Sequence, residues 1–235
     1  MPPAEAGDPA TVAAGHPVAV RHVTKVYGTG DEAVRALDGV DLDVKRGEMV
    51  ALVGPSGCGK STLLNLVGCV DVPTSGSVCV DGKPTHELDD DGLTRLRRDR
   101  VGTVFQFFNL LPALRVFENV ALPLVLQRVA RAEIAARVDA ALASVGLGEK
   151  ARAYPAQLSG GQLQRVAIAR AVVHRPVVVL ADEPTGNLDS RTGATVLKLL
   201  RELADGGQAI LMATHSDEAA AICDRVIHLR DGRVV

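Results

Sequence analysis

The chain has 235 residues, a length that suits one large domain or a domain with an added lobe. Hydrophobic residues make up 47% and charged residues 23%, as in an ordinary α/β protein, and the net charge of −2 gives no overall basic field. We therefore expect no nucleic-acid partner.

No apolar run approaches the roughly 18 residues that span a bilayer, and no signal peptide is recognisable. Any role at a membrane would then go through a partner protein. The four cysteines contain no C-x-x-C pair, which argues against a disulfide framework or a zinc site. A reducing cytoplasm is the expected compartment.

The N-terminal part is predicted to contain a tail and then a small sheet. Residues 1–16 are rich in Ala, Pro and Gly and are expected to be a disordered tail, with the domain over residues 17–235. Strand-like runs over Val18–Tyr27 and Val34–Val44 flank a glycine turn and predict an antiparallel β layer. Tyr27, just before the turn, is either an aromatic that stacks on a nucleotide base or a half-buried strand residue.

A P-loop follows the apolar strand Met49–Val53 and opens a helix. Glycines let the backbone N–H groups converge on phosphate oxygens, and the helix N-terminus adds partial positive charge. Lys60 would reach the β- and γ-phosphates, and the Ser61 hydroxyl would hold Mg²⁺. The predicted nucleotide-binding stretch is Gly54, Pro55, Ser56, Gly57, Cys58, Gly59, Lys60, Ser61 and Thr62.

The next segment is predicted to contain a turn over residues 73–76, a strand over Ser77–Val80 and a solvated helix near Leu93–Arg100. Although that helix carries four arginines, flanking aspartates argue against a nucleic-acid patch. A strand over Val101–Phe105 then ends at Gln106.

A helical lobe is predicted over about residues 107–157, with one helix near residues 130–146 whose apolar residues recur at helical spacing. All four phenylalanines lie at or near the start of this lobe, at Phe105, Phe107, Phe108 and Phe117. They form either the core of the lobe or an apolar groove for a partner.

Beyond the lobe, Leu158–Gln162 opens a helix that runs to about Val173, and Ser159 and Gln162 have the spacing of a capping box. The next strand, Val177–Ala181, is apolar on both faces and delivers Asp182 and Glu183 to its carboxyl end. A helix that includes residues 196–203 follows. A second buried strand, residues 209–214, ends at His215, and residues 226–235 suggest a final hairpin.

In an open parallel sheet, ligands bind at the carboxyl ends of the strands. The P-loop, Gln106, the acid pair and His215 all follow strands, so we expect them at one edge. Asp182 would help hold Mg²⁺, and Glu183 would orient a water against the γ-phosphate. Burying two carboxylates together is costly without a cation or protonation, so Mg²⁺ is implied beside the nucleoside triphosphate, and the family resemblance below implies ATP.

This set of motifs resembles the ATP-binding-cassette (ABC) ATPases over residues 18–235. The resemblance implies a P-loop NTPase core with a mostly parallel sheet, an N-terminal antiparallel β layer and a helical lobe. Leu158–Gln162 is similar to that family's signature loop, so Ser159, Gly160, Gly161 and Gln162 would bind nucleotide. Asp189 matches its D-loop aspartate, and Tyr27 matches its adenine-stacking aromatic.

The resemblance also implies the catalytic set and the partners. Gln106 matches the Q-loop residue, which contacts the metal, and His215 the switch histidine; the implied catalytic residues are Glu183, His215, Gln106 and Lys60, and the implied metal ligands Ser61, Gln106 and Asp182. The sequences around Gln106 and Glu183 resemble the macrolide-exporter, lipoprotein-release and cell-division subgroup. Its members pair head to tail around two ATP molecules and drive a transmembrane permease, which predicts a homodimer bound peripherally at the cytoplasmic face of the membrane.

Export, lipoprotein release and mechanical transmission remain open within this reading. The alternatives are a soluble ABC ATPase that acts on DNA or ribosomes, and a P-loop kinase for a small acceptor. The chain has neither the long coiled coil nor the double cassette of the first, and the signature loop and the position of Glu183 argue against the second.

Overall fold

A computed structural model describes residues 16–235 of the chain. The predicted disordered tail, residues 1–16, lies outside the described residues except for His16. Within the described range no helix is both long and apolar enough to cross a membrane.

The first layer is a four-stranded antiparallel sheet with the order β2-β1-β4-β5. Its strands are β1 (Val18–Tyr27), β2 (Val34–Val44), β4 (Ser75–Val80) and β5 (Lys83–Pro84), and a 3-10 turn, η1 (Gly30–Glu32), joins the first two. The predicted turn over residues 73–76 was wrong in its second half, because Ser75 pairs with Thr24 of β1. At Gly76 (φ +81°) any side chain would collide with the carbonyl oxygens of β1, so glycine allows this close approach.

The central sheet has six strands in the order β10-β9-β3-β8-β7-β6. All neighbours pair in parallel except the hairpin strand β10, which confirms the mostly parallel sheet. The strands are β3 (Met49–Val53), β6 (Val101–Val104), β7 (Val178–Asp182), β8 (Ala209–Thr214), β9 (Arg225–Arg230) and β10 (Arg233–Val234). The register aligns Val53 with Thr214 and Asp182 with Ala213, so the strand ends that precede the predicted site residues share one edge.

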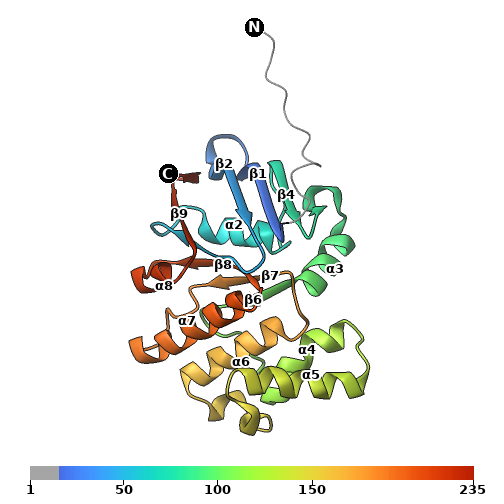
Figure 1. Ribbon diagram of the computed structural model, residues 1–235. Coiled ribbons are helices and arrows are strands. Elements are labelled where there is room, and N and C mark those ends of the chain that lie inside the picture. The colour runs from blue at the N-terminus through green and yellow to red at the C-terminus, as the bar shows by residue number, and fades with distance from the viewer. Residues whose placement is uncertain (1–15) are drawn as a thin grey trace.

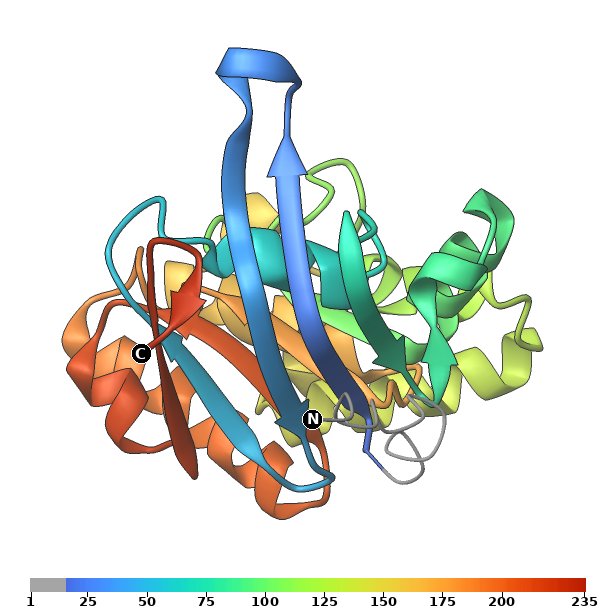
Figure 2. The ribbon, with the colours of Figure 1, turned by 90° about the horizontal axis from the view of Figure 1, so that it is seen from above.

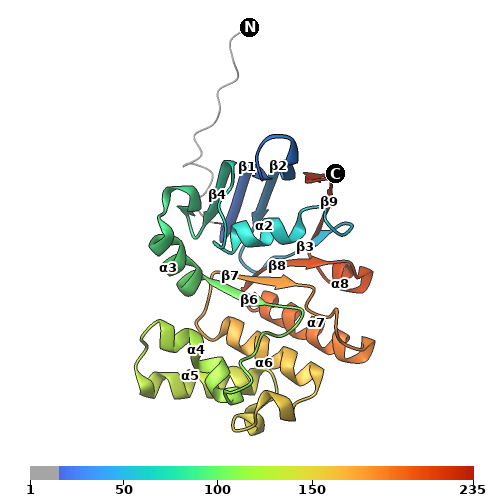
Figure 3. The same cartoon turned by 180° about the vertical axis from the view of Figure 1, so that it is seen from behind.

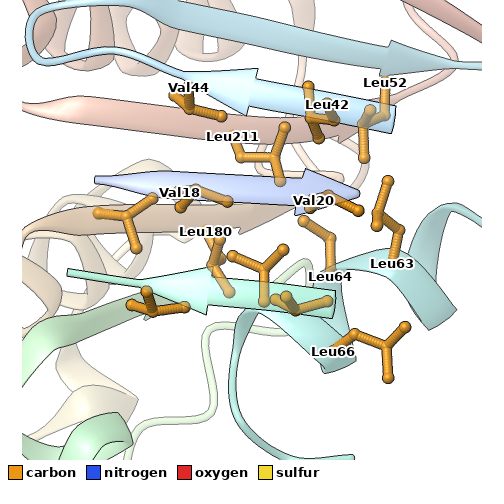
Figure 4. Packing of buried hydrophobic residues seen from close by; sticks show 14 of the residues in the cluster. Val18, Val20, Leu42, Val44, Leu52, Leu63, Leu64, Leu66, Leu180 and Leu211 are labelled. Carbon is orange, nitrogen blue, oxygen red and sulfur yellow. The ribbon is translucent and has the colours of Figure 1, made fainter. Parts of the chain in front are cut away.

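Side chains that alternate along the central strands build two cores on opposite faces of the sheet. Val50, Leu52, Leu180 and Leu211 face the antiparallel sheet and the helix α2 (Lys60–Val67), which lies between the two sheets. Figure 4 shows this layer, where Val20 of β1 lies near Leu64 of α2 and Val18 lies further along the strand, near Leu180.

The opposite face of the central sheet is covered by two helices, α6 (Gly160–Val172) and α7 (Ser190–Asp205). Met49, Val179 and Met212 point to this side and pack with Ile168 and Leu200. Seen from above, the antiparallel strands cross over the central sheet, and the β1–β2 turn extends beyond it (Figure 2).

The helical lobe lies at the far end of the molecule from the antiparallel sheet (Figures 1 and 3). It consists of α4 (Val116–Leu126), α5 (Arg131–Ser144), the short turns η3 (Gly148–Lys150) and η4 (Pro155–Gln157), and the adjoining part of α6. Phe117 packs against the lobe core, as one of the two predictions has it, whereas Phe105 and Phe107 are exposed.

Three further helical elements complete the fold: η2 (Thr85–Glu87), α3 (Asp90–Arg100) and α8 (Asp217–Ala221). The five-residue helix α8 is not apparent from the sequence, because it is too short to show a helical period.

Candidate nucleotide site

The P-loop lies between β3 and α2 and is shaped by its glycines. Gly57 (φ +78°) and Gly59 (φ +108°) adopt left-handed backbone conformations that favour glycine. Gly59 also approaches Ala36, whose carbonyl oxygen would lie 2.5 Å from a Cβ at that position. A side chain at Gly54 would collide with the carbonyl oxygen of Leu229. The loop therefore holds its curvature by close contact with β2 and β9.

The side chains of the P-loop divide between the surface and the interior. The Lys60 ammonium donates to the carbonyl oxygens of Gly54 at 2.6 Å and Pro55 at 3.0 Å, so it lies over the loop. Ser56 and Ser61 are exposed, whereas Cys58 is buried beneath the loop. The Cys58 thiol thus fills space, and a bound phosphate would meet the exposed rim, Lys60 and Ser61.

The two acids occupy the end of β7 and the first position after it. Burial raises the pKa of the Asp182 carboxyl, the neighbouring Glu183 raises it further, and the Lys60 ammonium opposes both effects. Glu183 adopts a left-handed conformation (φ +47°), which is unusual for a residue other than glycine. Its N–H donates to Ala213 O at 3.0 Å, and its carbonyl accepts from Gly186 N at 3.0 Å. The backbone of Glu183 is therefore held by strand β8 and by the turn that follows Glu183.

His215 lies directly against Glu183. The His215 Nδ1 atom is 2.8 Å from Glu183 Oε1, and the His215 N–H donates to Glu183 Oε2 at 3.4 Å. The imidazole is mostly exposed and the carboxylate mostly covered, with exposed fractions of 71% and 18%. The predicted convergence of the acid pair and the histidine is thus present in the fold.

Gln106 reaches the loop that follows Glu183 through a pair of amide contacts. Its Nε2 donates to Asn187 Oδ1 at 3.4 Å, and Asn187 Nδ2 donates to Gln106 O at 3.1 Å. Gly186 permits the approach, because a Cβ there would lie 2.8 Å from Gln106 Nε2. Sequence reasoning did not single out Asn187, and its place in the turn after Glu183 was the only local signal.

Asp189, at the end of the same loop, is the N-cap of α7. Its carboxylate accepts from Thr192 N at 3.0 Å, and hydrogen bonds from the Thr192 side chain and backbone lower the pKa of the Asp189 carboxyl. The family resemblance predicts that Asp189 binds nucleotide. In the structure its carboxylate caps the N-terminus of α7.

Tyr27 is half exposed, at 41%, and its ring is held by two residues that sequence reasoning missed. Its hydroxyl donates to Asp71 Oδ2 at 3.0 Å, and the Lys25 ammonium lies 4.9 Å from the ring centroid. Lys25 in turn donates to Asp71 Oδ1 at 2.6 Å. The hydrogen bond to Asp71 fixes the hydroxyl end of the ring, and the Lys25 ammonium lies over one of its faces.

The signature-like loop is not part of the cluster around the P-loop. Ser159 and Gln162 form the predicted capping box, with Ser159 N donating to Gln162 Oε1 at 2.9 Å and Gln162 N to Ser159 Oγ at 3.4 Å. Gly161 packs so tightly on Thr192 of α7 that a side chain there would collide with it. Because α6 and α2 pack on opposite faces of the central sheet, this loop is separated from the P-loop of its own chain.

The fold and the site together define a P-loop nucleoside triphosphatase with a helical lobe. The family model described as ABC transporter matches residues 37–186. The chain belongs to the ABC transporter family, as one of its ATPase cassettes.

Relatives and solved structures agree with this assignment. Over 222 residues the chain is 46% identical to the uncharacterized ABC transporter ATP-binding protein MJ0796 of Methanocaldococcus jannaschii, a match that covers 92% of this chain and 94% of that protein. A dimeric structure of MJ0796, described as a post-hydrolysis state bound to ADP and Pi, covers 92% of this chain and 96% of its own, with a TM-score of 0.83.

A second kind of relative is longer. The chain is 49% identical over 218 residues to the macrolide export ATP-binding/permease protein MacB of Hyphomonas neptunium, covering 93% of this chain and 34% of that protein. The chain thus spans about a third of the length of this relative. Both relatives agree with the subgroup that the sequence motifs indicate.

Proposed function

We propose that this protein binds and hydrolyses ATP as a homodimer and drives a transmembrane permease. The observation that carries this proposal is the position of Glu183, which lies beside Asp182 and pairs with His215. Glu183 follows β7, and only β8 separates β7 from the P-loop strand β3 in the sheet. A carboxylate placed there suits the orientation of an attacking water. Lys60 would bind the β- and γ-phosphates, and His215 would steady Glu183 and the γ-phosphate.

Mg²⁺ fits the oxygen-bearing side chains near the phosphate cradle. Ser61, Asp182 and Gln106 would hold the ion, whose charge would offset the developing charge on the phosphates. The raised pKa of the Asp182 carboxyl is what a half-buried acid shows beside a second acid. Within residues 16–235 no cluster of three or more His, Cys, Asp or Glu side chains forms a metal cage, as suits an ion shared with a triphosphate.

Adenine would stack on Tyr27, and the signature loop would serve the nucleotide of the second subunit. The separation of this loop from the P-loop within one chain supports this, because a two-fold pair would bring each signature loop to the P-loop of the other subunit. Ser159, Gly160 and Gly161 would then contact the γ-phosphate through the N-terminus of α6, with Gln162 capping that helix. Asp189 would lie at the same interface. The relative MJ0796 is described as dimeric, with ADP and Pi bound.

A groove between α3, β6, α4 and α6 supports a permease as the partner. It encloses about 480 Å³, and its apolar wall includes Phe105, Leu122 and Leu126. Phe105 and Leu126 are exposed at 38% and 62% and line the same groove, and a contiguous apolar surface of this kind suits a protein partner. The protein would then bind peripherally at the cytoplasmic face of the membrane and be cytoplasmic when unassembled.

The alternative, a soluble ABC ATPase that acts on DNA or ribosomes, has less support. The relatives are transporter proteins by name, and the net charge gives no basic field for nucleic acid.

Mixing two inactive variants tests the shared site. Lys60→Ala removes the P-loop cation, and Ser159→Arg blocks the signature loop. In a mixture, half of the dimers would be mixed and hold one intact site of two, so we expect up to about a quarter of wild-type turnover. No recovery, together with turnover per chain independent of concentration, would refute the dimer. A wild-type protein that releases no phosphate from ATP would refute hydrolysis itself.

A further inference from the structure

Gln164 is a fully buried glutamine that joins two loops of the candidate site. It lies on α6, one helical turn after Gly160, with an exposed fraction of 0%. Its Nε2 donates to Pro184 O at 2.7 Å and to Phe105 O at 3.3 Å. Both partners are backbone carbonyls, which only accept, so the amide nitrogen must be the atom that faces them.

The two carbonyls flank the residues proposed to act on the water. Phe105 O belongs to the peptide bond that leads into Gln106, and Pro184 comes directly after Glu183. These segments leave adjacent parallel strands, β6 and β7. A single side-chain amide therefore sets the spacing of the loops that carry Gln106 and Glu183.

The left-handed backbone of Glu183 requires hydrogen bonds that hold it in place. A left-handed conformation at a residue other than glycine persists only where its surroundings hold it. The bond from Gln164 to Pro184 O adds to those from Glu183 N to Ala213 O and from Gly186 N to Glu183 O. Gln164 thus acts on Glu183 from the side of the helical lobe.

A purely structural role explains the glutamine poorly. Within the described part of the chain its amide oxygen is buried and has no hydrogen-bond partner, which destabilises the fold. An apolar residue of similar shape would avoid that unmade bond but would donate nothing to the two carbonyls. The amide is therefore best explained by the hydrogen bonds that its N–H groups donate to Phe105 O and Pro184 O.

We propose that Gln164 is a positioning residue that couples the signature helix to Gln106 and Glu183 of the same subunit. Engagement of the α6 N-terminus by the ATP of the second subunit moves α6, and Gln164 transmits this movement to the two loops. Hydrolysis in one site thereby depends on contact with the other subunit. This inference rests on the proposed function.

The test compares Gln164→Met with Gln208→Met. Gln208 is a partly buried control for these hydrogen bonds, because its Nε2 also donates to two backbone carbonyls, Pro176 O and Ala209 O, both at 3.2 Å. These carbonyls lie at the amino ends of β7 and β8, away from the site. For Gln164→Met we expect kcat to fall at least about tenfold, with the KM for ATP within about twofold of wild type. Gln208→Met should keep the wild-type kcat.

Two further measurements separate positioning from folding. Gln164→Met should still unfold in a single thermal transition, and it should still form an ATP-dependent dimer when combined with Glu183→Gln. Equal kcat values for the two variants would overturn the inference. So would a joint loss of stability, ATP binding and dimerisation in Gln164→Met alone. A wild-type protein without ATPase activity would instead refute the proposed function.

Gln164→Glu gives an independent readout through pH. A protonated carboxyl can donate one of the two hydrogen bonds, whereas an ionised carboxylate faces two carbonyls that repel it. We expect kcat of this variant, relative to Gln164→Met, to rise as pH falls. A ratio that stays constant with pH would contradict the role of the donor.

Discussion

The imidazole of His215 lies 2.8 Å from the carboxylate of Glu183, and no other side chain of residues 16–235 forms a hydrogen bond to that carboxylate. The histidine therefore fixes the orientation of the proposed water-orienting acid. Because they would act as a unit, their removal should be strongly non-additive.

We expect His215→Ala and Glu183→Gln each to lower kcat by about 100-fold or more, and the double variant to be no slower than the slower single variant. Steady-state turnover at saturating ATP measures this. Additive losses would show that the two side chains act separately. Glu183→Gln should still bind ATP and accumulate as a dimer, which size-exclusion chromatography with ATP would detect.

The raised pKa of Asp182 leads us to expect that the free energy of unfolding depends on pH when no nucleotide is bound. Its pKa is raised in the folded state, first by burial and then by Glu183. The folded chain therefore retains this proton to a higher pH than the unfolded chain, and its contribution to the unfolding free energy falls as pH rises through that interval. Above the interval the ionised carboxylate destabilises the fold.

Asp182→Asn removes this effect, so its gain in thermal midpoint over wild type should be larger at about pH 7 than at about pH 4. Thermal unfolding in EDTA without ATP measures the difference. The same variant should lose ATPase activity with Mg²⁺. A stability difference that grows toward acid pH would have the opposite sign and would contradict the assigned burial of the charge.

We expect the aromatic ring of Tyr27, and not its hydroxyl, to contribute to the affinity for ATP. Stacking of a base on an aromatic side chain contributes about 1–3 kcal/mol, so Tyr27→Ala should raise the KM for ATP roughly tenfold or more with kcat little changed. Tyr27→Phe keeps the ring and loses the hydrogen bond to Asp71. The KM of Tyr27→Phe for ATP should stay within about threefold of the wild-type KM. Similar KM values for Phe and Ala would assign the effect to the hydroxyl instead of the ring.

We expect a charged substitution inside the apolar groove to weaken binding of the permease, and one beside the groove to leave it unchanged. Leu126 lines the groove, whereas Val125 is the preceding residue of α4, exposed at 55%, and does not line it. Leu126→Glu should abolish the stimulation of ATPase activity by membranes that contain the permease, because it places a charge against an apolar partner surface. Val125→Glu should keep both the stimulation and the basal rate. Equal stimulation of both variants would place the partner elsewhere.

The sequence by itself determined the elements whose causes are local. The P-loop glycines, the apolar run before Asp182 and Glu183, and the capping box of Ser159 and Gln162 each carry their own backbone preferences or periodicity. Strand ends could be assigned to one edge because all ligand-bearing turns follow parallel strands. The family resemblance then supplied the expected roles.

The tertiary structure alone decided which distant groups meet. The order β9-β3-β8-β7-β6 places strands side by side that are far apart in the chain, and no local pattern encodes that order. It brings His215 to Glu183 and Asn187 to Gln106. It also places α2 and α6 on opposite faces and buries Gln164 between two loops. Contacts across long sequence separations depend on the packing of the whole sheet, so they are visible only in the folded chain.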